Sequence, residues 1–204
     1  MRSADALLRL ITIGWVGLVA GCAHRATVIS GFDVLALPGQ PVFVRAKVER
    51  ASVLRPDVEH PIVRFRIVQG PTAPIDLGTV RGDEDGVAAI QYKPAQPGNY
   101  WIECARLDRS GRPIGTGRLL LACRDGRRPM IAADIDGTLT VERGPLWSTS
   151  IRPYDRYTVE VINKLARQYD IIYLSGRLRY LLGQTRSWLR KNNLPDGPIF
   201  LLDP

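Results

Sequence analysis

Short runs of apolar residues alternate with polar residues through residues 32–123, and Gly, Pro and Asp gather between the runs. Alternation of this kind is typical of β-strands with one buried face, and the segments between the runs predict turns. No stretch of this region has the spacing of a helix. Regularly spaced short strands of this type predict an all-β sandwich over residues 32–123. The runs are PVFVRAKVER, PIVRFRIVQG, GVAAIQYKPA, GNYWIECARL and GRLLLACR.

The pattern changes after residue 127. MIAADI (130–135), DIIYLSG (170–176) and GPIFLLD (197–203) are apolar runs typical of buried strands. Strands that alternate with helices predict right-handed βαβ units and a parallel sheet, so we expect an α/β, Rossmann-like domain over residues 128–204. The residues at helical spacing between these runs are Val159, Ile162, Leu165 and Ala166, and then Leu181, Leu182, Thr185 and Leu189.

The N-terminus carries an apolar run behind two arginines. Arg2 and Arg9 stand ahead of the run Leu10–Ala20. This run is too short to span a bilayer comfortably and is typical of a signal peptide. The end of this run, VAGC, resembles the lipobox of bacterial lipoproteins. The resemblance implies removal of residues 1–21 and acylation of Cys22, which would anchor the protein without a transmembrane helix.

This resemblance also implies a location. Because Ala23 and not Asp follows the cysteine, we expect the cell envelope, at the outer membrane and facing the periplasm, with residues 22–31 as a linker. The alternative is an ordinary signal peptide, or a short anchor, with an incidental cysteine. If Cys22 is acylated, Cys104 and Cys123 could pair in an oxidising compartment or remain buried thiols. A hairpin turn at residues 110–111 would put them out of register, whereas a loop centred near residue 113 would bring them opposite each other.

Composition and charge limit the partners. The chain has 204 residues, 45% of them hydrophobic, and a formal net charge of +8. The positive charge is spread along the chain, unlike the clustered charge of a nucleic-acid-binding surface, so we expect no nucleic-acid partner. A mild basic excess favours phosphorylated or anionic-lipid partners.

Two aspartates and a serine stand where predicted parallel strands end, which is where such sheets place their active sites. Asp134 and Asp136 close the first strand and Ser175 closes the second. One carboxylate can attack phosphorus, and a second, two residues along on the same side of an extended backbone, can move the proton. Gly137 lets the loop turn tightly and lets backbone N–H groups approach phosphoryl oxygens. The pattern predicts phosphoryl transfer.

DIDGT (134–138) resembles motif I, D-x-D-G-T, of the haloacid dehalogenase-like (HAD) phosphatase superfamily, and YLSGR resembles its motif II. The resemblance implies that Asp134 is the nucleophile and Asp136 the general acid and base. It also implies a Mg²⁺ ion, held by the Asp134 side chain and the Asp136 carbonyl, that offsets charge in the transition state. The residues implied in phosphate binding are Ile135, Gly137, Thr138, Ser175 and Gly176.

A longer set of segments, DIDGTLT, YDIIYLSGR, QTRSWL and LPDGPIFLLDP, resembles the catalytic domain of lipin-type phosphatidate phosphatases and their bacterial relatives. That resemblance implies phosphatidate or another lipid phosphate as substrate. It places Thr140 and Arg177 where the family contacts substrate or supports the loop; for Arg177, solvation at a helix start is the alternative.

The β-rich part resembles bacterial immunoglobulin-like domains of the invasin type, in which a Gly-Ala strand precedes a PG-x-Y turn. This implies an immunoglobulin-like module that serves as a spacer or as a platform for a protein partner. Its acidic segment, residues 83–85, could attract calcium, but a charged hairpin tip is the better explanation.

The HAD resemblance is incomplete. The superfamily also uses a Lys after the third strand and acidic residues after the fourth, whereas this sequence stops on its third strand. Lys164, Lys191 and Asp203 do not stand in the corresponding places. We therefore expect either a truncated sequence or a degenerate domain, and an open edge on the first strand.

Three function classes follow from the sequence. The first class is a phosphatase lipoprotein. The second is a non-catalytic envelope lipoprotein with a binding module and a vestigial phosphatase-like domain. A nucleotide-binding regulatory domain is the least favoured class, because neither G-x-x-x-x-G-K nor G-x-G-x-x-G occurs.

Overall fold

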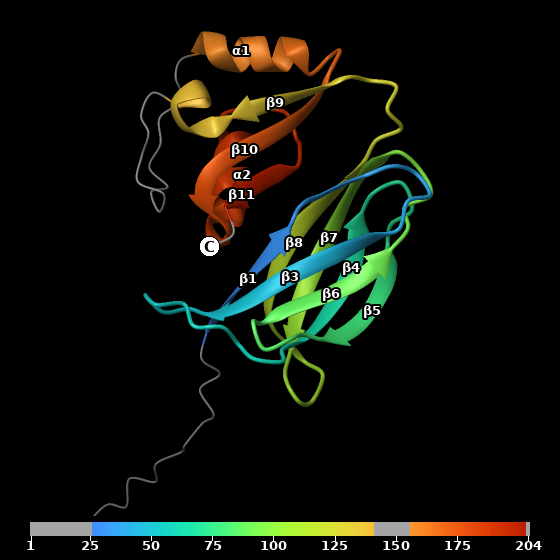
Figure 1. The fold of residues 1–204 in the computed structure, drawn as a ribbon, viewed down its shortest axis with the longest axis vertical. Helices are drawn as coiled ribbons and strands as arrows, with labels where there is room; N and C mark the ends of the chain where they lie inside the picture. The colour runs from blue at the N-terminus through green and yellow to red at the C-terminus, as the bar shows by residue number, and fades with distance from the viewer. Residues whose placement is uncertain (1–25, 141–155, 203–204) are drawn as a thin grey trace, which may run out of the picture.

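The computed structural model describes residues 26–140 and 156–202. The predictions for the signal peptide, for Cys22 and for Asp203 lie outside these residues. In the described part of the chain, no helix is both long enough and apolar enough to cross a bilayer. The chain forms two parts, an all-β sandwich and a smaller unit in which helices accompany a parallel sheet (Figure 1).

The sandwich consists of two sheets packed face to face. One sheet has the order β1-β3-β6 and the other β2-β8-β7-β4-β5. Neighbours pair antiparallel except β2 with β8, which pair in parallel. The strands are β1 (Thr27–Phe32), β2 (Val34–Ala36), β3 (Val42–Arg50), β4 (Ile62–Gln69), β5 (Ile75–Arg81), β6 (Val87–Tyr92), β7 (Gly98–Leu107) and β8 (Pro113–Cys123).

Alternation along these strands explains the sandwich. In β4 every second residue is buried, and Val63, Phe65 and Ile67 are fully buried. They meet Val44 of β3 and Ile102 of β7 in one core that lies between the two sheets. The all-β sandwich predicted from the pattern is therefore observed, with no helix in residues 26–124.

The predicted start of the sandwich is wrong. The sequence predicts a linker over residues 22–31, but β1 begins at Thr27 and pairs along its length with β3, from Thr27 opposite Arg50 to Phe32 opposite Arg45. The segment TVISGF has a Ser and a Gly in place of apolar residues, which weakens its alternation. Gly31 is required there by packing, because a Cβ would lie 2.5 Å from the Cβ of Leu119.

The two described cysteines do not form a disulfide. Both are free and buried. The β7–β8 hairpin turns at residues 108–112, so that Cys104 faces Gly117 and Cys123 faces Gly98. This is the out-of-register arrangement, and burial raises the pKa of both thiols. Asp108 holds the turn by accepting the backbone N–H groups of Ser110 and Arg112, both at 2.9 Å.

The acidic segment 83–85 forms a hairpin tip between β5 and β6. The Asp83 carboxylate accepts the N–H of Val87 at 2.8 Å, and Gly86 has a φ of +73°. The carboxylate thus supports the turn geometry, as short acidic side chains often do.

The C-terminal unit, our name for residues 128–202, contains a three-stranded parallel sheet in the order β11-β10-β9. Its elements are β9 (Met130–Asp134), α1 (Arg156–Leu165), β10 (Asp170–Leu178), α2 (Leu182–Lys191) and β11 (Ile199–Leu202). Both helices contribute to one core with the sheet, through Ile162 of α1 and Leu182 and Leu189 of α2. The parallel pairing follows the predicted order of strands and helices. In the described residues β9 has a strand neighbour, β10, on one side only.

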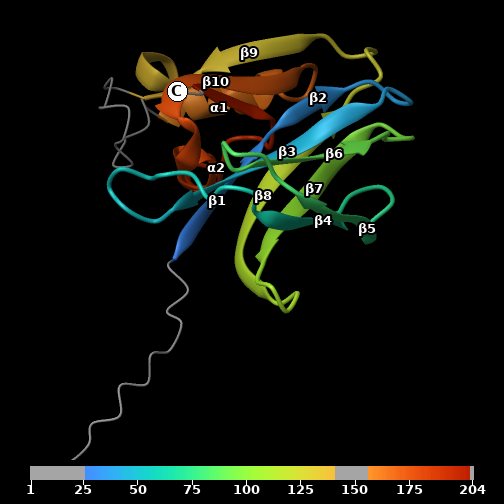
Figure 2. The same ribbon diagram turned by 60° about the horizontal axis from the view of Figure 1, so that its bottom comes forward.

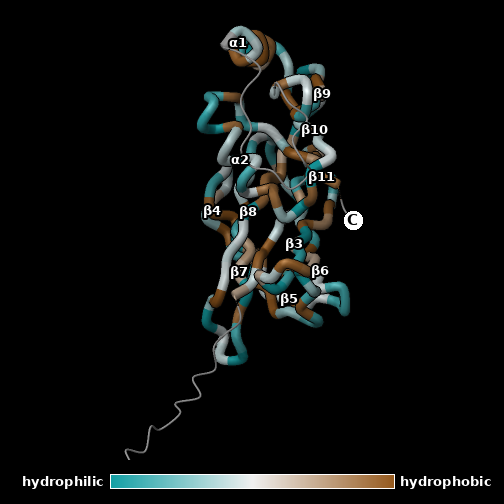
Figure 3. Tube along the Cα trace, turned by 90° about the vertical axis from the view of Figure 1, so that its left-hand side faces the viewer, coloured by the Kyte–Doolittle hydropathy of each residue, from teal (hydrophilic) through white to brown (hydrophobic). Residues whose placement is uncertain are grey.

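The C-terminal unit lies against the β1 side of the sandwich, as two views show (Figures 1 and 2). Hydrophobic positions recur along the strands and along α1, whereas hydrophilic positions gather in the connecting loops (Figure 3). The connection between the two parts, residues 124–129, is short. The two parts are therefore adjacent and in contact, and not separated by a long linker.

Candidate active site

The loop Ile135–Leu139, which follows β9, is shaped by a glycine and a buried threonine. Gly137 has a φ of +89°, a conformation that side chains with a Cβ rarely adopt. Its N–H donates to the Thr140 hydroxyl oxygen at 3.1 Å. The same hydroxyl donates to the carbonyl of Ile135 at 3.2 Å. Thr140 is fully buried. It therefore supports the loop and does not present its hydroxyl to a substrate.

Asp136 is held by two residues from the end of β10. Ser175 Oγ donates to Asp136 Oδ2 at 2.6 Å. Arg177 donates through Nη2 to Oδ1 at 2.8 Å and through Nε to both oxygens, at 3.1 and 3.2 Å. A guanidinium that binds both oxygens fixes the carboxylate in position and orientation. The sequence separates these residues by about forty positions, and parallel pairing of β9 with β10 brings them together.

Arg177 is a buried charge with several partners. Its side chain is 3% exposed. Beyond Asp136, its Nη1 donates to Thr185 Oγ1 of α2 at 3.4 Å, and its backbone N–H donates to Ser175 Oγ at 3.1 Å. A buried guanidinium needs such partners to offset its lost hydration. Arg177 thus connects the loop after β9 with helix α2, and the alternative of solvation at a helix start is wrong.

A bulge in β10 places Arg177. Tyr173, Leu174 and Ser175 pair in sequence with β11, but the next pair joins Leu178 to Leu202, so Gly176 and Arg177 are extra residues on β10. Such a bulge bends a strand and redirects a side chain. Gly176 is exposed, and β10 runs two residues beyond its predicted end.

Asp134 differs from Asp136. It ends β9, is exposed, and makes no side-chain hydrogen bond or ion pair with any residue in 26–140 or 156–202. Ile135 between the two aspartates is fully buried, so the carboxylates at 134 and 136 alternate with a core residue. Thr138 is exposed on the same loop. Within residues 26–140 and 156–202, the site therefore combines one carboxylate that has no side-chain partner with one that is fixed.

Sequence reasoning placed most of these residues but missed some contacts. The structure brings together Asp136, Ser175 and Arg177, and it keeps Asp134, Gly137 and Thr138 on the adjoining loop. For Thr185 the sequence predicts only a position on the apolar face of a helix. A hydroxyl on an otherwise apolar helical face was the one signal that a polar partner lay opposite.

The donors available for a metal ion are few. The described residues contain no cluster of three or more His, Cys, Asp or Glu side chains that could hold a metal. Both oxygens of the Asp136 side chain are engaged by Arg177 and Ser175. The carboxylate of Asp134, which has no partner among the described side chains, suits Mg²⁺, which commonly takes one or two carboxylates and completes its shell with water and phosphate oxygens.

Comparison with known proteins bears on the C-terminal unit. Residues 131–204 match the family model of the LNS2 domain of PITM 1-3. This is a lipin-like domain with a HAD-like phosphatase fold, so the match supports a lipin-like phosphatase family for this part of the chain. It does not extend to the sandwich or to the N-terminus. A search of curated proteins gave no match.

Solved structures resemble the chain only distantly. Fibronectin(III)-like modules of Clostridium thermocellum CbhA share 14% identity over 48% of this chain and 97% of theirs, with a TM-score of 0.31. A superoxide reductase (neelaredoxin) from Ignicoccus hospitalis shares 14% over 48% and 80%, with a TM-score of 0.29. A cycloisomaltooligosaccharide glucanotransferase of Paenibacillus sp. shares 14% over 72% and 19%, with a TM-score of 0.31. Scores this low carry no argument about function.

Proposed function

We propose that the chain is a phosphomonoester hydrolase of the HAD type, with its active site at the end of β9 and β10 and Asp134 as the nucleophile. The observation that carries the proposal is the contrast between the two aspartates. Asp134 is exposed and free of described partners, whereas Asp136 is fixed by Arg177 and Ser175. A nucleophile must reach its substrate, and a fixed neighbour can be positioned to act on the leaving group.

In the proposed reaction an Asp134 oxygen attacks phosphorus and forms an aspartyl phosphate, while the bond from phosphorus to the ester oxygen breaks. The departing alkoxide takes a proton from Asp136 in its protonated form and leaves as the alcohol. Asp136 then accepts a proton from water as the water attacks the aspartyl phosphate. This step releases inorganic phosphate and restores Asp134. One residue acts first as acid and then as base.

The neighbours have separate roles in this proposal. Arg177 orients Asp136 and does not itself contact substrate, because it is 3% exposed and bonded to Asp136 and Thr185. The N–H of Thr138, and the Ser175 hydroxyl once it turns away from Asp136, supply hydrogen bonds to the phosphoryl oxygens. Thr140 holds the shape of the loop by accepting the N–H of Gly137 and donating to the carbonyl of Ile135.

A Mg²⁺ ion fits this site only in part. The Asp134 side chain and the main-chain carbonyl of Asp136 would hold it, together with water and the phosphate. When bound, the ion would reduce the negative charge that keeps a carboxylate and a phosphate apart. The engaged Asp136 side chain leaves fewer ligands than a closed metal site needs, so we expect weak binding in the absence of a phosphate ester.

We further propose a lipid phosphate, phosphatidate among others, as the substrate, and a lipid anchor at Cys22 in the cell envelope. The support is the match to a lipin-like domain and the sequence at residues 19–22. Partition of the expressed protein into membranes, with residues 1–21 absent, tests the anchor. A soluble product with an unmodified Cys22 would refute it.

The test of the activity is a Mg²⁺-dependent phosphate-release assay on phosphatidate beside p-nitrophenyl phosphate. Asp134→Asn should reduce turnover below detection because it removes the nucleophile, and Asp136→Asn should slow turnover by roughly 10²–10⁴-fold. Asp76→Asn is the matched control, because Asp76 is an exposed aspartate in the sandwich. Full activity of Asp134→Asn would exclude Asp134 as nucleophile. Hydrolysis of soluble esters alone would leave the phosphatase and remove the lipid substrate.

One observation favours a second candidate function, phosphate recognition without turnover. Asp136 must part from Arg177 or Ser175 to exchange protons freely, and the structure gives it partners on both oxygens. A non-catalytic envelope lipoprotein would keep this ion pair and still bind a phosphorylated ligand through the loop. Binding of phosphatidate by the wild-type chain without release of phosphate would support this function over hydrolysis.

A further inference from the structure

Asp33, the residue between β1 and β2, is a buried carboxylate shared by three elements. Its side chain is 0% exposed. One oxygen accepts the N–H of Leu120 in β8 at 2.8 Å. The other accepts the N–H of Ile199, at the start of β11, at 2.8 Å and forms an ion pair with Arg186 of α2. One donor thus comes from the sandwich and two from the C-terminal unit. A buried charge requires such partners, so Asp33 links the two parts.

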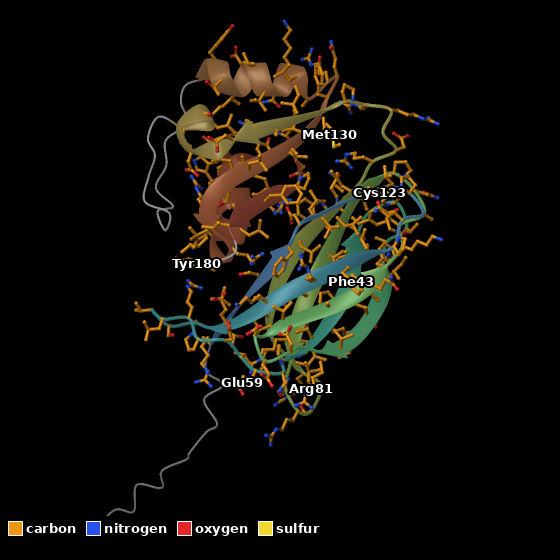
Figure 4. The ribbon with its side chains drawn as sticks, viewed as in Figure 1. Phe43, Glu59, Arg81, Cys123, Met130 and Tyr180 are labelled. Carbon is orange, nitrogen blue, oxygen red and sulfur yellow. The ribbon has the colours of Figure 1, made fainter. Side chains whose placement is uncertain are left out.

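Guanidinium groups stacked on aromatic rings surround this contact. Three arginines of the C-terminal unit lie over rings of the sandwich, and one arginine of the sandwich lies over a ring of the C-terminal unit. Figure 4 shows that last ring, Tyr180, at the side of the unit nearest the sandwich. Such contacts contribute both attraction and apolar packing. The pairs are Arg186 and Arg190 with Trp101 (both 4.7 Å from the ring centre), Arg179 with Phe32 (3.6 Å) and Arg55 with Tyr180 (3.7 Å).

The first residue of β10 is tied to the sandwich as well. Asp170 forms an ion pair with Arg124, at 3.0 Å between Nε and Oδ1, and both side chains are mostly buried. Arg124 also donates to Asn99 of β7 at 2.7 Å. Two separate attachments, one at Asp170 and one at Asp33, restrict rotation of the C-terminal unit against the sandwich.

The turn of α2 that binds Asp33 also contacts the candidate active site. Thr185 accepts a hydrogen bond from Arg177, and the next residue, Arg186, pairs with Asp33. Arg177 in turn holds both oxygens of Asp136. Thr185 is 1% exposed and Arg186 is 7% exposed, so water cannot easily replace either partner. A continuous set of polar contacts therefore runs from the sandwich to the aspartate of the site.

We propose that Asp33 is a positioning residue for the candidate active site, although it belongs to the sandwich. It fixes Arg186 and the first residue of β11. The position of α2 then fixes Thr185 and Arg177, and Arg177 orients the Asp136 carboxylate. The catalytic meaning of this coupling rests on the proposed function, whereas the coupling itself does not. The sandwich is in this view part of the support of the site and more than a spacer.

Four variants of the full chain separate coupling from general destabilisation. Asp33→Asn removes the shared charge, and Arg186→Lys keeps a cation at the position that pairs with Asp33. Thr185→Val removes the hydroxyl but keeps the size of the side chain. Asp76→Asn is the matched control, because its ion pair with Arg64 is exposed and joins two strands within the sandwich.

The first readout is amide hydrogen exchange, and the second is binding of inorganic phosphate by calorimetry. Asp33→Asn should lower protection at residue 199 and in residues 182–191 and 175–178, with β4 and β7 unchanged. Thr185→Val should lower it in residues 175–178 alone. Phosphate affinity should fall about 10–100-fold in Asp33→Asn, as when partners behind a ligating residue are removed. Arg186→Lys should lose less phosphate affinity than Asp33→Asn, and Asp76→Asn should match the wild type.

Two results would overturn the proposal. One is an equal loss of protection in both parts of the chain, which would make Asp33 a general stability residue. The other is unchanged exchange in residues 175–178 in both Asp33→Asn and Thr185→Val. If Asp33→Asn does not fold, Thr185→Val and Arg186→Lys decide by the same criteria. If the wild type binds no phosphate, the proposed function fails, and the exchange data alone decide the coupling.

Discussion

The sandwich and the C-terminal unit differ in how they are held together. The sandwich encloses an apolar core between two sheets, with Phe65, Ile102 and Leu119 fully buried. The C-terminal unit has a smaller core between its three-stranded sheet and its helices, with Ile135 and Tyr173 fully buried. Its contact with the sandwich depends on ion pairs and stacked guanidinium groups. Apolar burial stabilises without regard to direction, whereas these polar contacts also fix orientation.

This difference matches the different demands on the two parts. A site that holds a carboxylate within hydrogen-bond distance of two partners needs defined orientation of three elements. The polar contacts at Asp33 and Arg177 provide that orientation. The sandwich carries no comparable cluster of functional groups around its own core, within the part of the chain that the structure describes, and its polar side chains support turns such as those at Asp83 and Asp108.

The largest expected effect comes from separating the two parts. Residues 26–124 expressed alone should fold with a cooperative thermal transition, because their core is complete without the C-terminal unit. Residues 128–204 alone should show little cooperative structure, because Arg186 would lose its buried anionic partner and a small core rarely suffices. Circular dichroism with thermal melting of both fragments checks this. A cooperative transition of the second fragment alone would show that the unit does not need the sandwich.

A substitution in the apolar core should have the next largest effect. Phe65→Ala should reduce the free energy of unfolding by about 3–5 kcal/mol, since Phe65 is fully buried and the cavity would be lined by packed side chains. Urea denaturation measures this. Phe43→Ala is the control, because Phe43 is 61% exposed and stands next to the fully buried Val44 in β3, so it lies on the opposite face of the strand. Similar losses for both variants would contradict the assignment of the core.

Loss of one hydrogen bond in the site should have a smaller effect. Ser175→Ala removes the 2.6 Å hydrogen bond to Asp136 and leaves the Arg177 contacts in place. A hydrogen bond to a charged group contributes about 1.5–3 kcal/mol, so phosphate affinity or turnover should fall by the corresponding factor while the sandwich keeps its stability. Calorimetry and the phosphate-release assay measure the two. Ser187→Ala, an exposed serine of α2, serves as the control.

The smallest effect is a dependence of stability on pH through Asp33. Burial raises the pKa of the Asp33 carboxyl above its usual 3.8, with Arg186 and two backbone N–H groups opposing the change. The folded chain then binds a proton more tightly than the unfolded chain. The stabilisation that comes from protonated Asp33 is fully present below about pH 3.8, the usual pKa, and is lost as the pH rises through the pKa of the folded chain.

The difference in unfolding free energy between wild type and Asp33→Asn should therefore fall over that range and then level off. Urea denaturation at a series of pH values measures it. Asp76→Asn should not reproduce the trend, because the hydrogen bond from Arg64 holds the pKa of the Asp76 carboxyl below its usual value. An increase of the difference with pH would show that the contacts of Asp33 outweigh its burial.

Local pattern was enough for the elements that have a clear period, but it did not identify β1, β2 or β5. The alternation in IVRFRIVQ specified β4, and the helical spacing at Leu182, Thr185 and Leu189 specified α2. Pattern failed at β1, where TVISGF has no strong alternation. Pairing with β3 and close packing of Gly31 against Leu119 make that segment a strand. Such contacts join residues far apart in the sequence, so a local window could not have found them.

The sequence by itself determined the all-β part, the order of strands and helices in the C-terminal part, and the placement of Asp134, Asp136 and Ser175 at strand ends. Period and turn residues are local properties, and parallel strands bring their carboxyl ends to one edge. Only the tertiary structure decided that Arg177 is buried against Asp136, that Cys104 and Cys123 are out of register, and that Asp33 joins the two parts. These three features depend on the bulge in β10, on the length of the β7–β8 turn and on the contact between the sandwich and the C-terminal unit. Their free energies arise from residues that meet only after the chain has folded.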